Sequence, residues 1–306
     1  MADYTFVLNP EAGKGAGRKV GILLEQLLPG FGKSHELVRT ERAGHATEIA
    51  RSTTSPFVVA VGGDGTLNEV ANALVGSQKT IGIIPAGSGN DFIRSIGIPR
   101  SVQLALECLK TGRGRVIDAG RVQTGKDVNG SIQDAPERYF VNGVGIGFDA
   151  SVARRVSEIK HLRGTLLYLL AVLQTLGKYK SPEFHGTTDD RTWRSRELLV
   201  AAGNGRCAGG GFYLTPEARV DDGLLDVCII DDVSIPRILR LIPTVLGGKK
   251  VQDECVTYLR SKGLALRSSD VFNVHADGEI VGREVNSVKV GIVPSALCVV
   301  GGSQQD

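Results

Sequence analysis

Three short apolar runs near the start of the chain are each followed at once by a turn rich in glycine. The runs are YTFVL, PFVVAV and TIGII, and the turns that follow them are NPEAGKGAG (9–17), GGDGT (62–66) and PAGSGN (85–90). A short run rich in β-branched residues that stops at glycine is typical of a buried parallel strand. Strands and helices alternate in this way over roughly the first 120 residues, which predicts an α/β domain with an open, Rossmann-like parallel sheet and helices on both faces.

The expected elements of this first domain are short. We expect strands at 4–8, 34–40, 57–61 and 80–84, and helices at 14–28, 45–51, 66–74 and 102–110. Thr66 and, three residues later, Glu69 have the spacing of a capping box, in which the two side chains satisfy backbone N–H groups at the start of a helix. The sequence therefore predicts that a helix opens at Thr66.

Beyond Val116 the pattern changes to short, strand-like segments bounded by glycines. Segments such as RYFVNGVGIGFDA, ELLVAAGNG and VKVGIVPSALCVV predict a β-rich second domain, a sandwich, interrupted by helical stretches at 151–179 and 234–246. We place the nucleotide-binding α/β domain at 1–120 and the β-sandwich domain at 121–295. The C-terminal strand, 296–306, is a candidate to complete the first domain.

Composition narrows the function classes. A length of 306 residues suits two domains. A formal net charge of +3, with no basic block interleaved with aromatics, argues against a nucleic-acid partner. Five scattered cysteines without a C-x-x-C pair favour neither a disulfide framework nor a zinc site and fit a reducing cytoplasm. The start of the chain lacks the pattern of a signal peptide, and the longest apolar stretch, Leu166 to Leu176, is too short to span a membrane. We expect a cytoplasmic protein that touches membranes peripherally.

The glycine-rich turns predict a site for a phosphorylated ligand. Backbone N–H groups in a turn before a helix suit phosphate, and in open α/β sheets ligands bind at the carboxyl ends of the strands, where all three turns lie. Asp64, between glycines, is placed to organise Mg²⁺ or a phosphate-bound water. The alternative for any one turn is a plain connection between strand and helix, with Asp64 capping it locally.

Longer motifs resemble one family. GGDGTLNEVANAL, NPEAGKG, IPAGSGNDFIRSIGIP, GNGRCAGGGFYLTPEARVDDGLLDV and HADGE are similar to segments of the diacylglycerol kinase catalytic-domain family, in particular its soluble bacterial lipid kinases, and the similarity runs nearly from end to end. GGDG alone is less specific, because NAD kinases and 6-phosphofructokinases share it. The resemblance implies a fold related to those enzymes and, as cofactors, ATP and Mg²⁺.

The resemblance also assigns expected roles to single residues. The expected ATP-binding residues are Asn9, Pro10, Gly13, Thr40, Gly62, Gly63, Asp64, Gly65, Thr66, Asn68, Glu69, Ser88 and Asn90. For Mg²⁺ the resemblance implies the carboxylate of Asp222 with the backbone carbonyls of Arg219 and Leu224. The expected catalytic residues are Asp64, Asp277 and Glu279, with Glu279 as the general base that receives the proton of the acceptor hydroxyl. A solvated Glu279 in a plain turn is the alternative that the residues alone would favour.

A lipid acceptor requires apolar surface beside cations. Arg154 and Arg155 precede the apolar stretch that ends in Lys178 and Lys180, a pattern suited to an anionic bilayer, and 235–250 repeats it. The alternative is that both helices bury their apolar faces in the domain core. We expect transfer of the γ-phosphate to diacylglycerol, yielding phosphatidate. Ceramide or sphingoid bases as acceptors, NAD as acceptor, and a catalytically inactive nucleotide- or lipid-binding protein are the alternatives. The sequence leaves the oligomeric state open, a dimer included.

Overall fold

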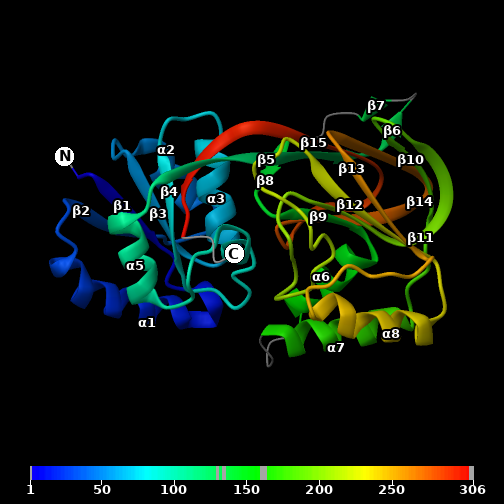
Figure 1. Cartoon of the computed structure of the whole chain (residues 1–306), viewed down its shortest axis with the longest axis horizontal. Coiled ribbons are helices and arrows are strands. Elements are labelled where there is room, and N and C mark those ends of the chain that lie inside the picture. Colours follow the sequence, from blue (N-terminus) through cyan, green and yellow to red (C-terminus); the bar gives the residue numbers. More distant parts are fainter. Residues whose placement is uncertain (1, 129–130, 133–135, 159–163, 303–306) are drawn as a thin grey trace. The chain divides into compact units, whose positions relative to one another are not determined.

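The computed structural model divides the chain into two compact units. It describes residues 2–128, 131–132, 136–158 and 164–302. One unit comprises residues 1–119 and 294–306, and the other comprises residues 120–293 (Figure 1). The chain thus returns to the first unit at its C-terminal end.

Unit 1 is built on a parallel sheet. Its strands are β1 (Tyr4–Leu8), β2 (His35–Arg39), β3 (Phe57–Gly62) and β4 (Thr80–Pro85), and the last residues of β15 (Glu279–Val300) pair beside β4. The order across the sheet is β15, β4, β3, β1, β2, and every pairing in it is parallel. β3 is almost wholly buried. The carboxyl ends of β1, β3 and β4 therefore lie at one edge of the sheet, as expected from the sequence.

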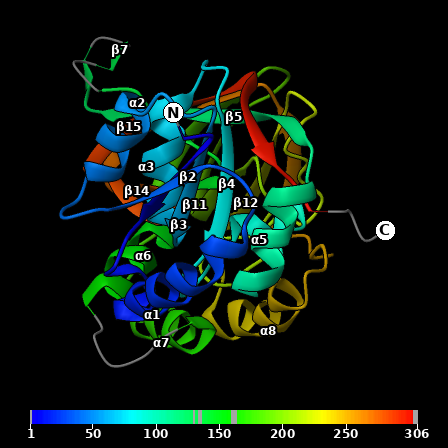
Figure 2. The same ribbon diagram turned by 90° about the vertical axis from the view of Figure 1, so that its left-hand side faces the viewer.

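Helices cover both faces of this sheet (Figure 2). They are α1 (Ala12–Leu27), followed by the 3₁₀ turn η1 (Leu28–Gly30), α2 (His45–Ser52), α3 (Asp64–Leu74), α4 (Phe92–Ile96) and α5 (Val102–Thr111). The α/β architecture expected from the sequence is confirmed. The short helix α4 was not expected.

The expected capping box of Thr66 and Glu69 is wrong. Helix α3 begins at Asp64, two residues earlier, with Gly63 at its N-cap and no side-chain cap. The carboxylate of Glu69 instead accepts hydrogen bonds from the backbone N–H groups of Gly44 (3.0 Å) and Ala46 (3.1 Å). These groups open α2, whose own N-cap offers no side chain, so Glu69 caps a neighbouring helix rather than its own.

Unit 2 is antiparallel. Its strands are the second half of β5 (Gly114–Gly125), β6 (Asp127–Val128), β7 (Ser131–Ile132), β8 (Arg138–Phe140), β9 (Gly143–Gly147), β10 (Glu183–Thr188), β11 (Thr192–Gly203), β12 (Leu225–Asp231), β13 (Val256–Ser261), β14 (Gly263–Ala276) and most of β15. The strands run in the order β13, β12, β11, β10, β14, β15, while β9 pairs with both β11 and β14. Phe140, Phe184 and Leu266 are buried between the strands. The sandwich expected from the sequence is confirmed.

Three helices of unit 2 form a second apolar layer. They are α6 (Phe148–Glu158), α7 (Gly164–Leu176) and α8 (Ile235–Leu246). The expected single stretch 151–179 is thus two helices, and residues 159–163 lie outside the described residues. Apolar side chains of all three helices pack with β11 and β12 in one cluster, separate from the core of the sandwich. Among the described residues, the longest and most apolar helices fall short of what a membrane crossing requires.

Candidate active site

The three glycine-rich turns of unit 1 are linked by side-chain hydrogen bonds. Asn9, after β1, donates from Nδ2 to Oγ1 of Thr66 (3.0 Å) in the turn after β3. Asp64, in the same turn, accepts at Oδ1 from the backbone N–H groups of Asp91 (2.9 Å) and Phe92 (3.3 Å), which follow β4. The turns after β1, β3 and β4 therefore form one connected surface.

Glycine is required where these turns touch. A Cβ atom on Gly87 would overlap the Cα atom of Gly63, and a Cβ on Gly13 would lie 2.5 Å from the carbonyl oxygen of Ala86. Gly13 also has a φ of 59°, in the left-handed region that favours glycine. The turns meet through bare backbone, which is the surface that a phosphate group can approach closely.

The structure brings most of the expected ATP-binding residues to this edge. Asn9, Pro10, Gly13, Gly62 to Thr66, Ser88 and Asn90 lie at the carboxyl ends of β1, β3 and β4 or in the first residues of the helices α1 and α3. Thr40 follows the neighbouring strand β2, and its N–H donates to the carbonyl of Leu8 (2.8 Å). Asn90, with a φ of 50°, exchanges hydrogen bonds with the backbone of Gly87. Asn68 and Glu69 lie on α3. Asn68 is buried and Glu69 caps α2, so both residues stabilise helices that follow the turns.

In unit 2, Asp277 holds a tight turn together. With a φ of 48°, it stands at the turn between β14 and β15, and its carboxylate accepts three backbone hydrogen bonds. The donors are Val141 (2.9 Å), Asn142 (2.9 Å) and Gly143 (3.0 Å). A carboxylate with three N–H donors is strongly held, so Asp277 fixes this turn.

Glu279 lies next to this turn and opens β15. Its carboxylate is about half exposed and forms an ion pair with Arg138, whose Nη2 lies 3.2 Å from Oε2. Asp277 and Glu279 are both partly exposed, but the carboxylate of Asp277 is held by three N–H donors, so that of Glu279 is the more available to receive a proton from a bound alcohol.

A buried histidine paired with a partly buried aspartate, which sequence reasoning missed, lies next to the turn. His275 Nε2 lies 2.8 Å from Oδ2 of Asp149, and the two residues are 126 positions apart in the sequence. His275 is 3% exposed. A Cβ on Gly145 would overlap both contacting atoms, so glycine there leaves the room that the pair needs. The two residues do not form a motif with a recognisable spacing. The one local signal is that His275 is the first residue of the segment HADGE.

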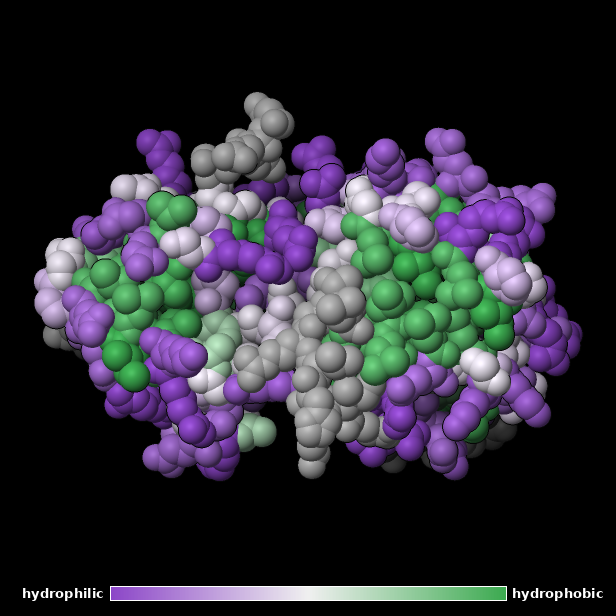
Figure 3. Space-filling view, turned by 90° about the horizontal axis from the view of Figure 1, so that it is seen from below, coloured by the Kyte–Doolittle hydropathy of each residue, from purple (hydrophilic) through white to green (hydrophobic). Residues whose placement is uncertain are grey.

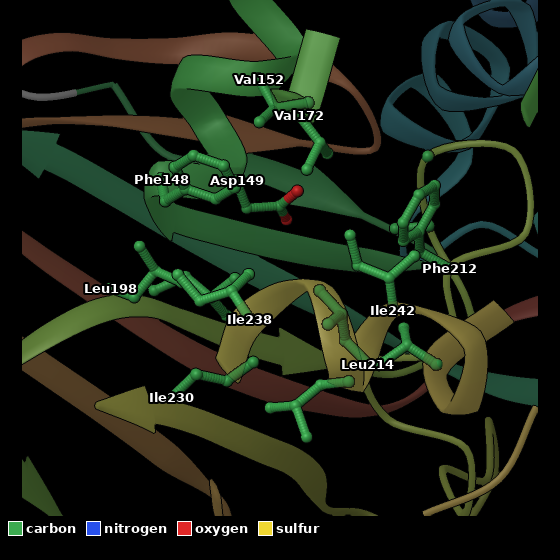
Figure 4. A pocket seen from close by; sticks show the side chains of 15 residues that line it. Phe148, Asp149, Val152, Val172, Leu198, Phe212, Leu214, Ile230, Ile238 and Ile242 are labelled. Carbon is green, nitrogen blue, oxygen red and sulfur yellow. The ribbon is translucent and has the colours of Figure 1, made fainter. Parts of the chain in front are cut away.

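An apolar pocket lies beside this pair (Figure 4). Its lining leaves a cavity of about 80 Å³, and the space around it opens to solvent. Its described lining comes from α6, α7, α8, β11, β12 and the loop before β12, and consists of Phe148, Asp149, Val152, Val172, Leu198, Leu199, Ala208, Gly209, Phe212, Leu214, Ile230, Ile238, Leu241, Ile242 and Val245. Of these described residues only Asp149 has a polar side chain, and Figure 4 shows its carboxylate pointing into the pocket.

A smaller cavity continues from the pocket towards the turn of Asp277. The two spaces share Asp149, Ala208 and Leu214, and the smaller one also touches His275 and Asn142. Asn142 is one of the residues held by the carboxylate of Asp277. The apolar pocket, the pair of His275 and Asp149, and the turn before Glu279 are therefore neighbours within unit 2.

The expected magnesium ligands lie in the loop before β12. Asp222 pairs with Arg260 through Oδ2, while its Oδ1 accepts from the N–H of Leu224 (3.1 Å). Oδ2 of Asp226 is buried and lies 3.7 Å from Nε of Arg260, which makes an ion pair. The same oxygen accepts no hydrogen bond within the part of the chain that the structure describes. Burial chiefly, and then the charge of Asp222, raise the pKa of Asp226 to about 6.

Asp222 and Asp226 are carboxylates of the kind that binds Mg²⁺. In this structure the guanidinium of Arg260 lies against Oδ2 of both, so a metal ion would take the place of that side-chain cation. The described residues contain no cluster of three acidic, histidine or cysteine side chains arranged for a metal, so backbone carbonyls would have to complete the site. The roles of the carbonyls of Arg219 and Leu224 stay a prediction.

Comparison with known families accounts for both units. Residues 3–122 match the model of the diacylglycerol kinase catalytic domain, and residues 142–301 match that of the YegS C-terminal NAD kinase beta sandwich-like domain. The chain belongs to the diacylglycerol kinase family of lipid kinases. It is 30% identical over 98% of its length to a diacylglycerol kinase of Mycobacterium tuberculosis, 95% of which is covered. It is 35% identical over 84% of its length to a probable lipid kinase YegS-like of Pseudomonas aeruginosa, 80% of which is covered.

Solved structures show the same fold in this kinase family and beyond it. The fold is similar to that of a putative diacylglycerol kinase from Bacillus anthracis, with a TM-score of 0.78 at 21% identity over 99% of this chain and 98% of the other. It is also similar to yeast NADH kinase, with a TM-score of 0.53 at 11% identity over 99% of this chain and 84% of the other. The predicted relationship to NAD kinases is therefore confirmed for the fold.

Proposed function

We propose that this lipid kinase uses ATP to phosphorylate diacylglycerol. The observation that carries the proposal is the apolar pocket of unit 2, whose described lining is hydrocarbon except for Asp149. Hydrocarbon walls of this kind suit acyl chains rather than a nucleotide. The relatives named diacylglycerol kinase support the choice of acceptor.

The connected turns of unit 1 are proposed to bind the phosphates of ATP. Bare backbone at Gly13, Gly63 and Gly87 lets phosphate oxygens approach N–H groups, while Asp64 and Asn9 keep the turns in place. The acceptor hydroxyl oxygen forms a bond to the γ-phosphorus, the bond from that phosphorus to the bridging oxygen breaks, and ADP leaves. Glu279 receives the hydroxyl proton.

Mg²⁺ is proposed at the loop before β12. Asp222 would hold it with the carbonyls of Arg219 and Leu224, and Asp226, whose Oδ2 ion-pairs with Arg260 (3.7 Å), lies nearby. There the ion would neutralise the carboxylates and stiffen the loop. A nucleotide-bound Mg²⁺ would in addition neutralise the triphosphate.

A γ-phosphate transfer assay tests the proposed reaction. Purified protein with labelled ATP and Mg²⁺ is expected to label phosphatidate when diacylglycerol is presented in mixed micelles, and chelation of Mg²⁺ is expected to stop the transfer. Ceramide, sphingosine and NAD are the parallel acceptors. A labelled ceramide or sphingosine product would change the acceptor, labelled NADP would contradict a lipid acceptor, and no labelled product would favour a binding protein.

We further propose that α7 and α8 place the lipid pocket against an anionic bilayer. Leu173, Ile235 and Leu239 expose 48%, 43% and 39% of their surfaces. Figure 3 shows apolar surface gathered on this side of unit 2, bordered by hydrophilic side chains. Exposed Arg154 and Arg155 lie on α6, and Arg155 donates from Nε to Oε1 of Gln174 on α7 (2.8 Å). Exposed apolar side chains beside cations suit an anionic interface.

Charge reversal at Arg154 and Arg155 is expected to weaken binding to phosphatidylglycerol vesicles at least about tenfold, since each basic residue near an anionic surface contributes about 1 kcal/mol. Vesicle sedimentation at low and high salt measures the effect, which salt should diminish. Lys19→Glu with Lys33→Glu, an equal charge change on exposed residues of unit 1, is the matched control. Equal losses in both double variants would mean that net charge, not this surface, drives binding.

A further inference from the structure

His275 contacts two parts of the lipid-binding unit at once. Its Nε2 lies 2.8 Å from Oδ2 of Asp149, the polar group of the apolar pocket. Its Nδ1 accepts a hydrogen bond from the backbone N–H of Gly278 (3.3 Å), which immediately precedes Glu279. Because a backbone N–H can only donate, Nδ1 acts as the acceptor and the ring proton lies on Nε2, which donates to Asp149.

The surroundings keep the imidazole of His275 in this orientation. The ring is buried, and opposite it β9 contributes Gly145, whose missing side chain leaves space for the contact with Asp149. On the other side, Asp277 fixes the turn through three backbone hydrogen bonds. Burying a polar group costs free energy unless the group is hydrogen-bonded, so the imidazole of His275 is held to the orientation that keeps both contacts.

We infer that His275 is a positioning residue for the acceptor lipid. Its Nε2 holds the carboxylate of Asp149 at the polar end of the apolar pocket. Its Nδ1 holds the turn that leads into Glu279. The position of the Glu279 carboxylate is thereby fixed relative to the pocket. The hydroxyl-bearing end of the lipid is thereby oriented, while its chains lie in the hydrocarbon part of the pocket. This inference rests on the proposed lipid-kinase function.

Two substitutions separate the two contacts of His275. In His275→Gln the side-chain amide nitrogen reaches the place of Nε2 and can still donate to Asp149. In His275→Asn the side-chain oxygen reaches the place of Nδ1 and can accept from Gly278, but no group reaches Asp149. Gly145→Ala disturbs the pair without removing either partner. His185→Asn, at an exposed histidine on β10, is the matched control.

The test is steady-state kinetics with dioctanoylglycerol in mixed micelles. His275→Asn is expected to raise the KM for the lipid by about 10- to 100-fold, the range for a hydrogen bond to a charged group, while the KM for ATP stays within about twofold. His275→Gln is expected to restore most of the lipid affinity, and Gly145→Ala to resemble His275→Asn. The double variant Asp149→Asn with His275→Asn should be no worse than Asp149→Asn alone, because the residues act through one contact.

Several outcomes would overturn the inference. One is an unchanged lipid KM in His275→Asn, with only the unfolding temperature lowered; another is an additive loss in the double variant. A fall of kcat in Asp149→Asn as large as that in Glu279→Gln would make Asp149 the base instead. These failures leave the proposed function standing, because the wild type would still phosphorylate the lipid. A wild type that transfers phosphate to no lipid would refute the proposed function, and the inference with it.

Discussion

Glu279→Gln is expected to lower kcat for lipid phosphorylation by about 10²- to 10⁴-fold, the usual contribution of a general base. The substitution keeps the size of the side chain and removes the group that receives the hydroxyl proton. The dissociation constant for ATP should not change, because the turns proposed to bind ATP belong to unit 1 and Glu279 belongs to unit 2. Initial rates with saturating lipid, together with equilibrium dialysis of ATP, measure both quantities.

The control for this variant lies on the same strand. Glu284 is exposed on β15, and Glu284→Gln changes the same charge without touching the turn at Asp277. Its kcat is expected to equal that of the wild type. Equal turnover in Glu279→Gln would remove Glu279 from the mechanism. A parallel loss of ATP affinity would instead mean that the variant disturbs the fold, since only the proton transfer should be affected.

The strands and turns of unit 1 could be predicted because local sequence determines them. Val58 to Val61 form a continuous apolar run that suits only a strand buried on both faces, and the glycines that follow are required where Gly63 meets Gly87. The order of strands and helices then leaves few topologies. Periodicity and turn chemistry therefore sufficed for the architecture and for the place of the three turns.

The capping of α3 could not be predicted, because the decisive partner is distant. Thr66 and Glu69 have the spacing of a capping box, but Glu69 binds N–H groups of α2, more than twenty residues earlier. Thr66 in turn accepts from Asn9 on the first turn. A local pattern identifies side chains able to cap a helix, and tertiary contacts decide which helix they cap.

The pair of Asp149 and His275 could not be predicted for the same reason. Asp149 follows β9 and His275 is the second-last residue of β14, and the pairing of these strands brings them together across 126 positions. No spacing rule connects them. The apolar pocket could not be predicted either, since its lining comes from three helices, two strands and the loop before β12, which are far apart in the sequence. Side chains within one motif could be predicted, and contacts between motifs could not.

A buried carboxyl is expected to make the stability of unit 2 depend strongly on pH. Glu197, on β11, is 0% exposed. It accepts hydrogen bonds at Oε1 from Trp193 and Ser195, while Oε2 accepts none within the described residues. Burial raises the pKa of Glu197 from its ordinary value of 4.5 to about 7, and the two hydrogen bonds only partly oppose this. The folded state thus holds its proton more tightly than the unfolded state does.

The sign of the effect follows from this difference. Stability due to protonated Glu197 is fully present below pH 4.5 and is lost as the pH rises through about 7. The expected loss of unfolding free energy between pH 5 and 8 is about 3 kcal/mol, and Glu197→Gln should remove it. Trp193 is the only tryptophan in the chain and contacts Glu197, so its fluorescence during urea unfolding reports on unit 2. Glu183→Gln, on neighbouring β10, should retain the pH dependence. An unchanged dependence in Glu197→Gln would assign it to other groups.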